Sequence, residues 1–349
     1  MIRIGIICPS EIAFRRFLPS LMKAKEFQYV GVAFASPEEW FGEKINTVGQ
    51  DTKDKVHTSE LEKAKKFVDS YGGKIFEGYK TLIVSDEIDA IYLPLPPALH
   101  FKWAEMALQH NKHVFVEKPS TTCLEDTQRL VSLAKAKRLV LHEDYMFVYH
   151  NQLEAINEIV RSGELGDVRL YRITFGFPRR DASDFRYNKV LGGGALLDAG
   201  GYTMKYATML LGMSGKLIAA TANYLSEFEV DMYGSATMVN DDGVVAQLAF
   251  GMDNDYKCDL EIWCSKGTLT SSRVLTAPTG FVPTCTIKKN QKYETRNLPD
   301  DDAFLKSILR FEQCVNDDTA RMENYDLIEH QEALVDQFKE LSQMPKELL

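Results

Sequence analysis

The chain has 349 residues, of which 45% are hydrophobic and 26% are charged, and its formal net charge is −9. This length favours two domains, and the composition is typical of a globular enzyme. The acidic balance disfavours nucleic acid as a partner, and no apolar run in the sequence reaches the roughly 20 residues that cross a membrane.

The first third of the chain alternates strand and helix signals. Helical spacing of apolar residues covers 13–24, and an amphipathic pattern covers 100–111. Strands that are apolar on both faces are predicted at 2–7, 28–35, 88–96 and 112–119. Such strands, joined by helices, predict a parallel sheet covered on both sides, the doubly wound α/β architecture of dinucleotide-binding (Rossmann) domains. We place this domain at residues 1–121.

One segment interrupts this alternation. Residues 37–58 are polar and show no periodicity, and a helix signal resumes only at Ser59 and ends at glycine. We therefore expect an inserted loop over about 37–58. Loops of this length inside a compact domain are usually functional or disordered.

From residue 122 the pattern changes. Two helices are predicted first, at 124–137 and 151–163, and two amphipathic helices are predicted later, at 301–318 and 325–344. Between them, period-two segments follow one another without helices, at 167–177, 216–225, 235–240, 244–252, 257–265 and 267–274. They predict a large, mostly antiparallel sheet with one open face, within an α+β domain that covers 122–349.

The cysteines bear on compartment and metal binding. The six of them, at positions 8, 123, 258, 264, 285 and 314, form no CxxC pair and no cluster with histidine. We expect no metal site and mostly buried, reduced thiols. A strand directly at the first residues leaves no room for a signal peptide, so we expect a cytoplasmic protein.

The tripeptide Glu117-Lys118-Pro119 ends the last predicted parallel strand. Ligands of open α/β sheets bind at this edge, and Pro119 keeps Lys118 out of helical geometry. Beside a positively charged nicotinamide the ammonium form of Lys118 is disfavoured, which suits acid/base chemistry. The alternative is a solvated lysine at a strand end.

A glycine triplet, residues 192–194, precedes a second helix signal. Asp198 and Tyr202 are four residues apart, so on a helix they share one face. A carboxylate beside a phenol can orient it as a proton donor to a carbonyl oxygen. The alternative is a core tyrosine and an aspartate at a helix start.

Together these motifs resemble the glucose–fructose oxidoreductase, inositol dehydrogenase and MocA-like (Gfo/Idh/MocA) oxidoreductases. The resemblance covers almost the whole chain. It rests on IYLPLPPALHFKWAEMAL, NKHVFVEKP, LHEDYMFVYHNQLEAINEIVRSGELGDV, FRYNKVLGGGALLDAGGY and LEIWCSKGTL. Several spaced blocks make it specific, whereas any one block would be weak.

The resemblance implies roles for individual residues. It places Lys118 beside the nicotinamide and the substrate, together with Asp198 and with Tyr202 where many members carry histidine. A tyrosine suits a general acid that protonates an alkoxide as hydride reaches a ketone. The resemblance also makes the turn with Leu95, Pro96 and His100, and the strand end at Glu117, part of the cofactor site, although His100 equally fits a plain helix start.

The turn after the first strand departs from the family pattern GCGxIA. Its two leading glycines are replaced by Cys8 and Ser10, while Ala13 keeps the third small position. Ser10 offers a hydroxyl to a phosphate, and the free N–H groups of a helix N-terminus do not depend on glycine. We therefore expect the pyrophosphate on Cys8, Pro9, Ser10, Glu11 and Ile12, with loss of binding as the alternative.

The type of cofactor, NAD or NADP, stays open. A carboxylate at the end of the second strand favours NAD, and an arginine favours NADP. The sequence there has Ser36, which suits ribose or phosphate, followed by two glutamates, and the lysines of 37–58 suit a 2′-phosphate or plain solvent exposure. The arginines of 177–188, among them Arg186, suit an anionic substrate or ion pairs with Asp181 and Asp184.

The sequence thus predicts an NAD(P)-dependent oxidoreductase that transfers a hydride between nicotinamide and a carbonyl or secondary alcohol of a sugar or nucleotide-sugar. Lys118, Arg186, Asp198 and Tyr202 are its expected substrate-binding residues. The alternatives are a dihydrodiol or aldose dehydrogenase and a non-catalytic sugar or dinucleotide sensor on the same fold. The resemblance also implies a homodimer or homotetramer that associates through the second domain's sheet.

Overall fold

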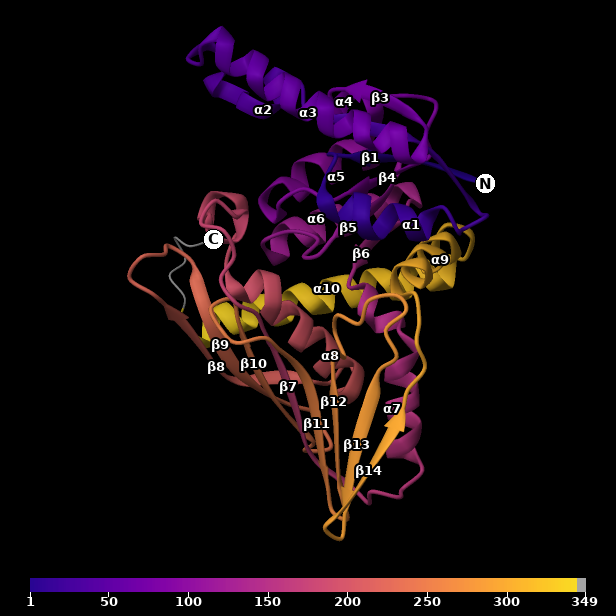
Figure 1. Ribbon diagram of the computed structural model, residues 1–349, viewed down its shortest axis with the longest axis vertical. Coiled ribbons are helices and arrows are strands. Elements are labelled where there is room, and N and C mark those ends of the chain that lie inside the picture. Colours follow the sequence, from indigo (N-terminus) through magenta and orange to yellow (C-terminus); the bar gives the residue numbers. More distant parts are fainter. Residues whose placement is uncertain (344–349) are drawn as a thin grey trace. The chain divides into compact units, whose positions relative to one another are not determined.

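A computed structural model describes residues 1–343, and the contacts within it divide the chain into two compact units (Figure 1). Unit 1 comprises residues 1–121, 125–144 and 307–326. Unit 2 comprises 122–124, 145–306 and 327–343. The boundary predicted at residue 121 differs from this division because two later segments belong to unit 1. Met344, the last residue of a predicted helix, lies outside the described residues.

Unit 1 is built on a six-stranded parallel sheet with the strand order β3-β2-β1-β4-β5-β6. The strands are β1 Ile2–Ile7, β2 Phe27–Phe34, β3 Lys74–Glu77, β4 Ala90–Leu93, β5 His113–Glu117 and β6 Leu141–Asp144. The order reverses between β1 and β4, and a doubly wound sheet binds its ligand at this switch point. The predicted Rossmann architecture is confirmed.

Helices join and cover these strands. They are a π-helical turn Ala13–Phe17 that leads into α1 Leu18–Leu21, then α2 Pro37–Phe41, α3 Gln50–Tyr71, α4 Tyr79–Ile83, α5 His100–Gln109 and α6 Leu124–Lys137. Two more, α9 Ala303–Asn316 and α10 Asp318–Leu341, continue from one unit into the other. Covered on both faces, central strand residues such as Ile4, Ile91 and Val114 are fully buried.

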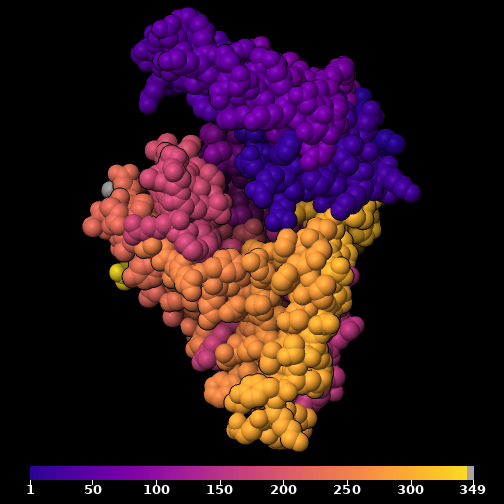
Figure 2. Space-filling view, in the orientation of Figure 1, coloured from indigo at the N-terminus to yellow at the C-terminus, as the bar shows by residue number. Residues whose placement is uncertain are grey.

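The loop expected over 37–58 is wrong as a description of local structure. Ser36 begins α2 with a capping box to Glu39, a short 3₁₀ turn Gly42–Asn46 follows, and α3 begins at Gln50. Only three of the 22 residues of α3 are buried, and its many lysines and glutamates have high helix propensity, so the helix has no broad apolar stripe. Figure 2 shows this violet segment on the surface of unit 1.

The sixth strand of unit 1, β6, was missed by the sequence prediction. Its four residues, LHED, are all buried although three of them are polar. Because β6 pairs with β5, the segment 125–144 completes the Rossmann sheet rather than opening the second domain. Polar residues at buried strand positions hide the pattern on which sequence prediction depends.

Unit 2 contains an eight-stranded sheet with the order β14-β13-β12-β11-β7-β10-β9-β8. The strands are β7 Val168–Gly176, β8 Lys216–Tyr224, β9 Asp231–Val239, β10 Val245–Gly251, β11 Lys257–Cys264, β12 Thr268–Ser272, β13 Thr284–Lys289 and β14 Lys292–Asn297. Only β7 and β10 pair in parallel. The predicted, mostly antiparallel sheet is confirmed.

Helices and alternating apolar side chains bury one face of this sheet. A π-helical turn Leu196–Gly200 continues into α8 Gly201–Leu211, which packs on β7 and β10, and α7 Asn151–Arg161 precedes β7. Tyr171, Ile173 and Phe175 of β7 point into this core, while Arg172 and Thr174 between them point to the open face. Period two therefore sorts the strand into a core side and an open side.

Candidate active site

The turn between β1 and the first helix bends tightly without glycine. Cys8 has a φ of 78°, a left-handed conformation that normally favours glycine. The Cys8 N–H donates to the Ala33 carbonyl at 3.0 Å, and the Ser10 N–H donates to the Cys8 carbonyl at 2.9 Å. Burial raises the pKa of the Cys8 thiol to about 12, against the lowering effect of a hydrogen bond with Tyr79. The thiol is therefore protonated at neutral pH.

The helix after this turn is capped by Ser10. The Ser10 hydroxyl oxygen accepts the Ala13 N–H at 3.3 Å, and its carbonyl accepts the Phe14 N–H at 3.0 Å. The helix begins at Glu11 and widens into the π-helical turn just before Pro19, which lacks an N–H and would crowd an α-helical carbonyl. A helix start of this kind leaves N–H groups without intrahelical partners, as anion binding requires.

The segment after β2 uses its polar groups internally. The Ser36 hydroxyl donates to Glu38 Oε2 at 2.9 Å. The Glu39 carboxylate accepts the N–H groups of Ser36, Tyr79 and Lys80 at 2.7–3.0 Å and so joins the starts of α2 and α4. A ribose or phosphate at Ser36 would compete with Glu38 for the hydroxyl.

His100, the first residue of α5, joins two loops of unit 1. One ring nitrogen, Nδ1, lies 2.8 Å from the Pro119 carbonyl oxygen, and the other, Nε2, lies 2.6 Å from the Leu95 carbonyl oxygen. Carbonyls only accept, so a neutral ring donates to one of them and an imidazolium donates to both. Burial, with a smaller effect of the Lys118 charge, lowers the pKa of His100 to about 4.

Lys118 lies between residues that buried groups hold in place. The peptide bond from Lys118 to Pro119 is cis. Before it, the Glu117 carboxylate accepts the Tyr92 hydroxyl at 2.5 Å. After it, the Ser120 N–H donates to Glu143 Oε1 at 2.9 Å. The predicted lysine therefore ends β5 in a turn that is fixed on both sides.

A buried polar cluster on β6 continues from this turn. Asp144 is opposite Glu117 in the register and accepts the Ser307 hydroxyl at 2.7 Å. His142 Nε2 lies 3.0 Å from the same hydroxyl oxygen. Burial, and after it the charge of Glu117, raises the pKa of Asp144 well above its usual range. Sequence reasoning did not assign Glu143 or Asp144, and their only signal was an acidic pair directly after an apolar run.

In unit 2 a glycine-rich loop brings Asp198 and Arg186 together. Arg186 Nε donates to Asp198 Oδ2 at 2.6 Å, and Nη1 donates to Asp184 Oδ1 at 3.1 Å. Burial opposes the charge of Arg186, but Asp198 and Asp184 outweigh it and raise its pKa. Gly193 has no Cβ, and a Cβ there would overlap the Arg186 carbonyl. The ion pair and the loop backbone therefore fit together only around a glycine.

Asp231, the first residue of β9, caps the helix that carries Asp198. Its Oδ2 accepts the Leu196 N–H at 2.7 Å, and its Oδ1 fills the space that a Cβ on Gly194 would take. Gly194 also has a φ of 120°, which side chains rarely adopt. Burial raises the pKa of Asp231 to about 6, against the Leu196 hydrogen bond. The sequence prediction missed this residue because it lies 33 residues from Asp198.

Tyr202, in the first turn of α8, lies within a group of aromatic rings. Its ring centroid is 5.2 Å from those of Tyr145 and Phe175 and 5.5 Å from that of Phe147. Edge-to-face and tilted packing of this kind fixes the orientation of a phenol ring. The neighbours come from β7 and from the segment after β6, so the ring is held by tertiary packing and not by its own helix alone.

The arginine-rich segment 177–188 is largely paired within unit 2. Arg179 binds Asp253 at 2.7 Å and Glu227 at 3.0 Å, and the guanidinium of Arg180 lies 5.2 Å from the centroid of the Phe177 ring. The expected alternative of internal ion pairs is met by Arg186 with Asp184. Asp181 instead accepts from Ser183.

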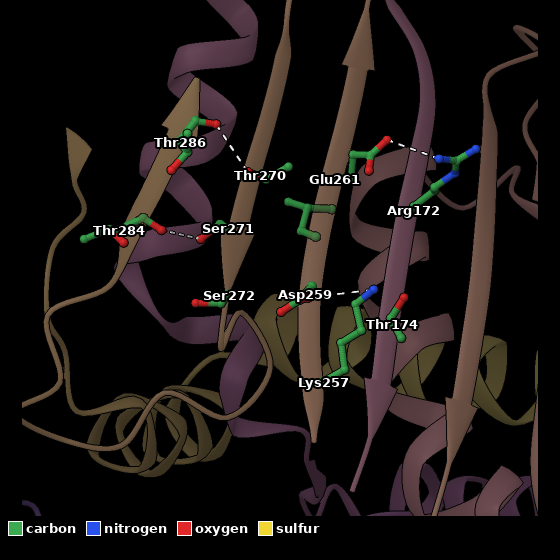
Figure 3. Close-up of a pocket in the computed structure, with 11 residues that line it drawn as sticks. Arg172, Thr174, Lys257, Asp259, Glu261, Thr270, Ser271, Ser272, Thr284 and Thr286 are labelled. Carbon is green, nitrogen blue, oxygen red and sulfur yellow. Dashed lines mark hydrogen bonds and ion pairs between the residues drawn. The ribbon is translucent and has the colours of Figure 1, made fainter. Parts of the chain in front are cut away.

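The open face of the unit 2 sheet carries two grooves. Figure 3 shows a groove of about 400 Å³ over β7, β11, β12 and β13, lined mainly by threonine and serine. Arg172 pairs with Glu261 at 3.3 Å and Lys257 with Asp259 at 4.0 Å along its floor. A second groove of about 410 Å³ continues over β8, β9 and β10.

The predicted site residues thus fall into two groups. In unit 1 they follow the carboxyl ends of four adjacent strands: Cys8, Pro9, Ser10, Glu11 and Ile12 after β1, Ser36 after β2, Leu95, Pro96 and His100 after β4, and Glu117 and Lys118 at the end of β5. In unit 2 they are Arg186, Asp198 and Tyr202.

Within residues 1–343, no helix is long and apolar enough to span a membrane. The same residues contain no group of three or more histidine, cysteine, aspartate or glutamate side chains that could hold a metal ion.

Comparison with known proteins agrees with this arrangement. Residues 5–145 match the model of an oxidoreductase family with an NAD-binding Rossmann fold, and residues 153–270 match a GFO/IDH/MocA C-terminal domain. The chain is 34% identical, over 90% of its length and 87% of the relative, to a dTDP-3,4-didehydro-2,6-dideoxy-alpha-D-glucose 3-reductase of Actinomadura kijaniata. It is 36% identical, over 90% and 85%, to an enzyme of the same name from Streptomyces violaceoruber.

A solved structure extends the likeness to three dimensions. KijD10, a 3-ketoreductase from Actinomadura kijaniata crystallised with NADP and TDP-benzene, superimposes with a TM-score of 0.86 and 32% identity. The match covers 97% of each chain. Nearly the whole fold of the chain is therefore shared with a known 3-ketoreductase.

Proposed function

The chain belongs to the Gfo/Idh/MocA family of NAD(P)-dependent oxidoreductases, and on that premise we propose that it is an NADPH-dependent ketoreductase of a dTDP-linked deoxysugar. Membership confirms the resemblance predicted from the sequence. The single observation that carries the proposed substrate is the identity of 34–36%, over 90% of this chain, to reductases of such sugars. The likeness to KijD10 with NADP and TDP-benzene supports the same substrate class.

The residues of unit 1 fit a dinucleotide. Cys8, at the position of the family's first glycine, has a left-handed backbone conformation, and Ser10 caps a helix whose N-terminus suits a pyrophosphate. The choice of NADPH is supported by the related ketoreductase KijD10, which was crystallised with NADP. The pKa of Glu38 is lowered mainly by its own backbone hydrogen bond and by the Ser36 hydroxyl, and to a smaller extent by the charge of Lys53 in α3. A cation is therefore near the end of β2.

The proposed chemistry follows the roles that membership of the family implies for Tyr202 and Lys118. The bound nicotinamide supplies the hydride. We assign the Tyr202 hydroxyl as the proton donor to the sugar carbonyl oxygen, because its ring is oriented by Tyr145, Phe147 and Phe175. We assign the Lys118 ammonium to the developing negative charge on that oxygen.

The role predicted for Asp198 becomes more specific. Its carboxylate holds Arg186, so we propose that it orients the helix start before Tyr202 and keeps Arg186 at the substrate side of the loop. Proton transfer then rests on Tyr202 and charge stabilisation on Lys118, with Asp198 as a positioning residue.

Separate calorimetric titrations with NADPH and NADH test the cofactor assignment first. We expect micromolar binding of NADPH and weaker binding of NADH. Turnover of a dTDP-linked 3-keto deoxysugar should then fall roughly 100-fold or more in Lys118→Ala and Tyr202→Phe, as expected for loss of acid catalysis, with the dissociation constant of NADPH changed far less. If the folded protein binds neither cofactor, the alternative of a non-catalytic sugar or dinucleotide sensor is favoured. If it turns over only dihydrodiols or free aldoses, the alternative of a dihydrodiol or aldose dehydrogenase is favoured.

We also propose that the open sheet face joins two copies of the chain. Its threonine, serine and alanine side chains are short, and its oppositely charged pairs suit a self-complementary surface. Ala249→Arg, in the second groove, should shift the protein from dimer or tetramer to monomer in sedimentation velocity, and Asp241→Arg, in a hairpin, serves as the exposed control. A wild-type monomer contradicts this proposal.

We also propose a cytoplasmic location, because none of the six cysteines, all of them among the described residues, forms a disulfide.

A further inference from the structure

Three of the residues that flank Lys118 are each held by a different side chain of unit 1. Glu117 accepts the Tyr92 hydroxyl at 2.5 Å. The Pro119 carbonyl lies 2.8 Å from His100 Nδ1. The Ser120 N–H donates to Glu143 Oε1 at 2.9 Å. These holding groups come from β4, α5 and β6, so the backbone on both sides of Lys118 is fixed from three directions.

His100 extends this hold to a second loop. Its other ring nitrogen is 2.6 Å from the Leu95 carbonyl, and its side chain is only 1% exposed. The loop after β4 and the turn after β5 therefore both contact one buried ring, which in its neutral form donates a hydrogen bond to one of the two carbonyls. In a doubly wound sheet both loops border the cofactor crevice.

Tyr92 extends the hold toward the first turn. Its ring stacks on Phe17 with a centroid distance of 3.7 Å and an interplanar angle of 4°. Phe17 ends the π-helical turn that follows Cys8–Ser10. One chain of contacts therefore runs from the predicted pyrophosphate turn through Phe17 and Tyr92 to Glu117, the residue before the lysine.

We propose that His100 and Glu143 are positioning residues that hold the Lys118 turn against the loop after β4. This inference rests on the catalytic role proposed for Lys118. Neither side chain needs to touch substrate, because each acts on the backbone of residues 119 and 120. A displacement of about 1 Å at a reacting group is enough to lower a rate roughly 100-fold.

Hydrogen exchange measured by mass spectrometry tests the hold without any need for turnover. Glu143→Ala removes the acceptor of the Ser120 N–H, so exchange of peptides over 118–123 should rise about 10-fold or more. Glu143→Gln keeps an oxygen at the same position and should restore protection. His100→Gln should also raise exchange in these peptides and, in addition, in peptides over 94–99.

His113 provides a matched control for His100. It is the first residue of β5, at the end of that strand away from Lys118, and its Nδ1 accepts the Val140 N–H at 2.9 Å. His113→Gln should therefore leave exchange over 118–123 unchanged. Unchanged exchange in both Glu143→Ala and His100→Gln, or an equal rise in His113→Gln, would overturn the proposal.

A double-substitution cycle tests whether the hold acts through Lys118. With the dTDP-linked 3-keto sugar, His100→Gln should lower kcat roughly 10- to 100-fold in the wild-type background and have little further effect in Lys118→Ala. Additive losses in the two backgrounds would contradict a role through the lysine. Absence of turnover in the wild type would refute the proposed function instead, and the exchange results would still decide whether the hold exists.

Discussion

Two helices that carry predicted site residues, one in each unit, widen into a π-helical turn near their start, but the loops before them differ. In unit 1 the loop is Cys8-Pro9-Ser10, without glycine; in unit 2 it is the glycine triplet 192–194. At Gly193 and Gly194 a side chain would overlap the Arg186 carbonyl and the Asp231 carboxylate. At Cys8 only a left-handed φ is required, and a side chain adopts it at a cost of about 1–2 kcal/mol. A missing glycine is thus tolerated where the chain only bends, and not where another group fills the space.

Gly193→Ala should give the largest effect. The added Cβ meets backbone on the neighbouring turn, which cannot move without displacing Arg186 from Asp198. We expect a loss of about 3 kcal/mol or more in unfolding free energy, measured by urea denaturation, and a comparable loss of turnover. Gly49→Ala is the control, because nothing lies within 4 Å of its Cβ position. Equal stability of the two variants would contradict the packing argument.

Asp231→Asn should have a smaller, pH-dependent effect. The folded-state pKa of Asp231, about 6, lies above the ordinary aspartate value of 3.8 because of burial. The stabilisation linked to this shift is complete below the unfolded pKa and is lost as pH rises through 6. Asparagine keeps an oxygen for the Leu196 N–H but does not titrate.

The comparison of the two proteins therefore depends on pH. The unfolding free energy of the wild type minus that of Asp231→Asn should fall, by up to about 3 kcal/mol, between pH 4 and pH 7. Urea denaturation at several pH values measures it. If the difference in unfolding free energy does not change with pH, folding does not shift the pKa of Asp231. The helix that Asp231 caps in unit 2 would then not differ electrostatically from the serine-capped helix of unit 1.

The architecture of both units could be predicted from the sequence because buried apolar positions recur along it at regular spacing. Apolar runs marked β1, β2, β4 and β5, and period two marked six strands of the unit 2 sheet, β7 to β12. The strands β3, β13 and β14 were not predicted. Nor were β6, which buries LHED, and the first turns of α3, which are exposed and polar. Residues such as Lys118 and Tyr202 were proposed from motifs. Glu143 and Asp231, which accept from the backbone of Ser120 and Leu196, were not, because contacts 23 and 35 residues apart leave no local pattern.

Cys8→Gly should give the smallest effect and bears directly on the loop that lacks glycine. Glycine relieves the left-handed conformation, a gain of about 1–2 kcal/mol. It loses the contact with Tyr79 and restores freedom to the unfolded chain, each a loss of roughly 1 kcal/mol. We therefore expect unfolding free energies within about 1 kcal/mol of each other.

Cys8→Ala separates these contributions, because alanine keeps the left-handed conformation and lacks the thiol. It should be less stable than both the wild type and Cys8→Gly, by about 1 kcal/mol. Calorimetry should give dissociation constants for NADPH within a few-fold in all three proteins, since the backbone bend is the same. A tightening of 10-fold or more in Cys8→Gly alone would show that the side chain obstructs the pyrophosphate, and that the first turn, like the second, needs glycine for space rather than for its bend.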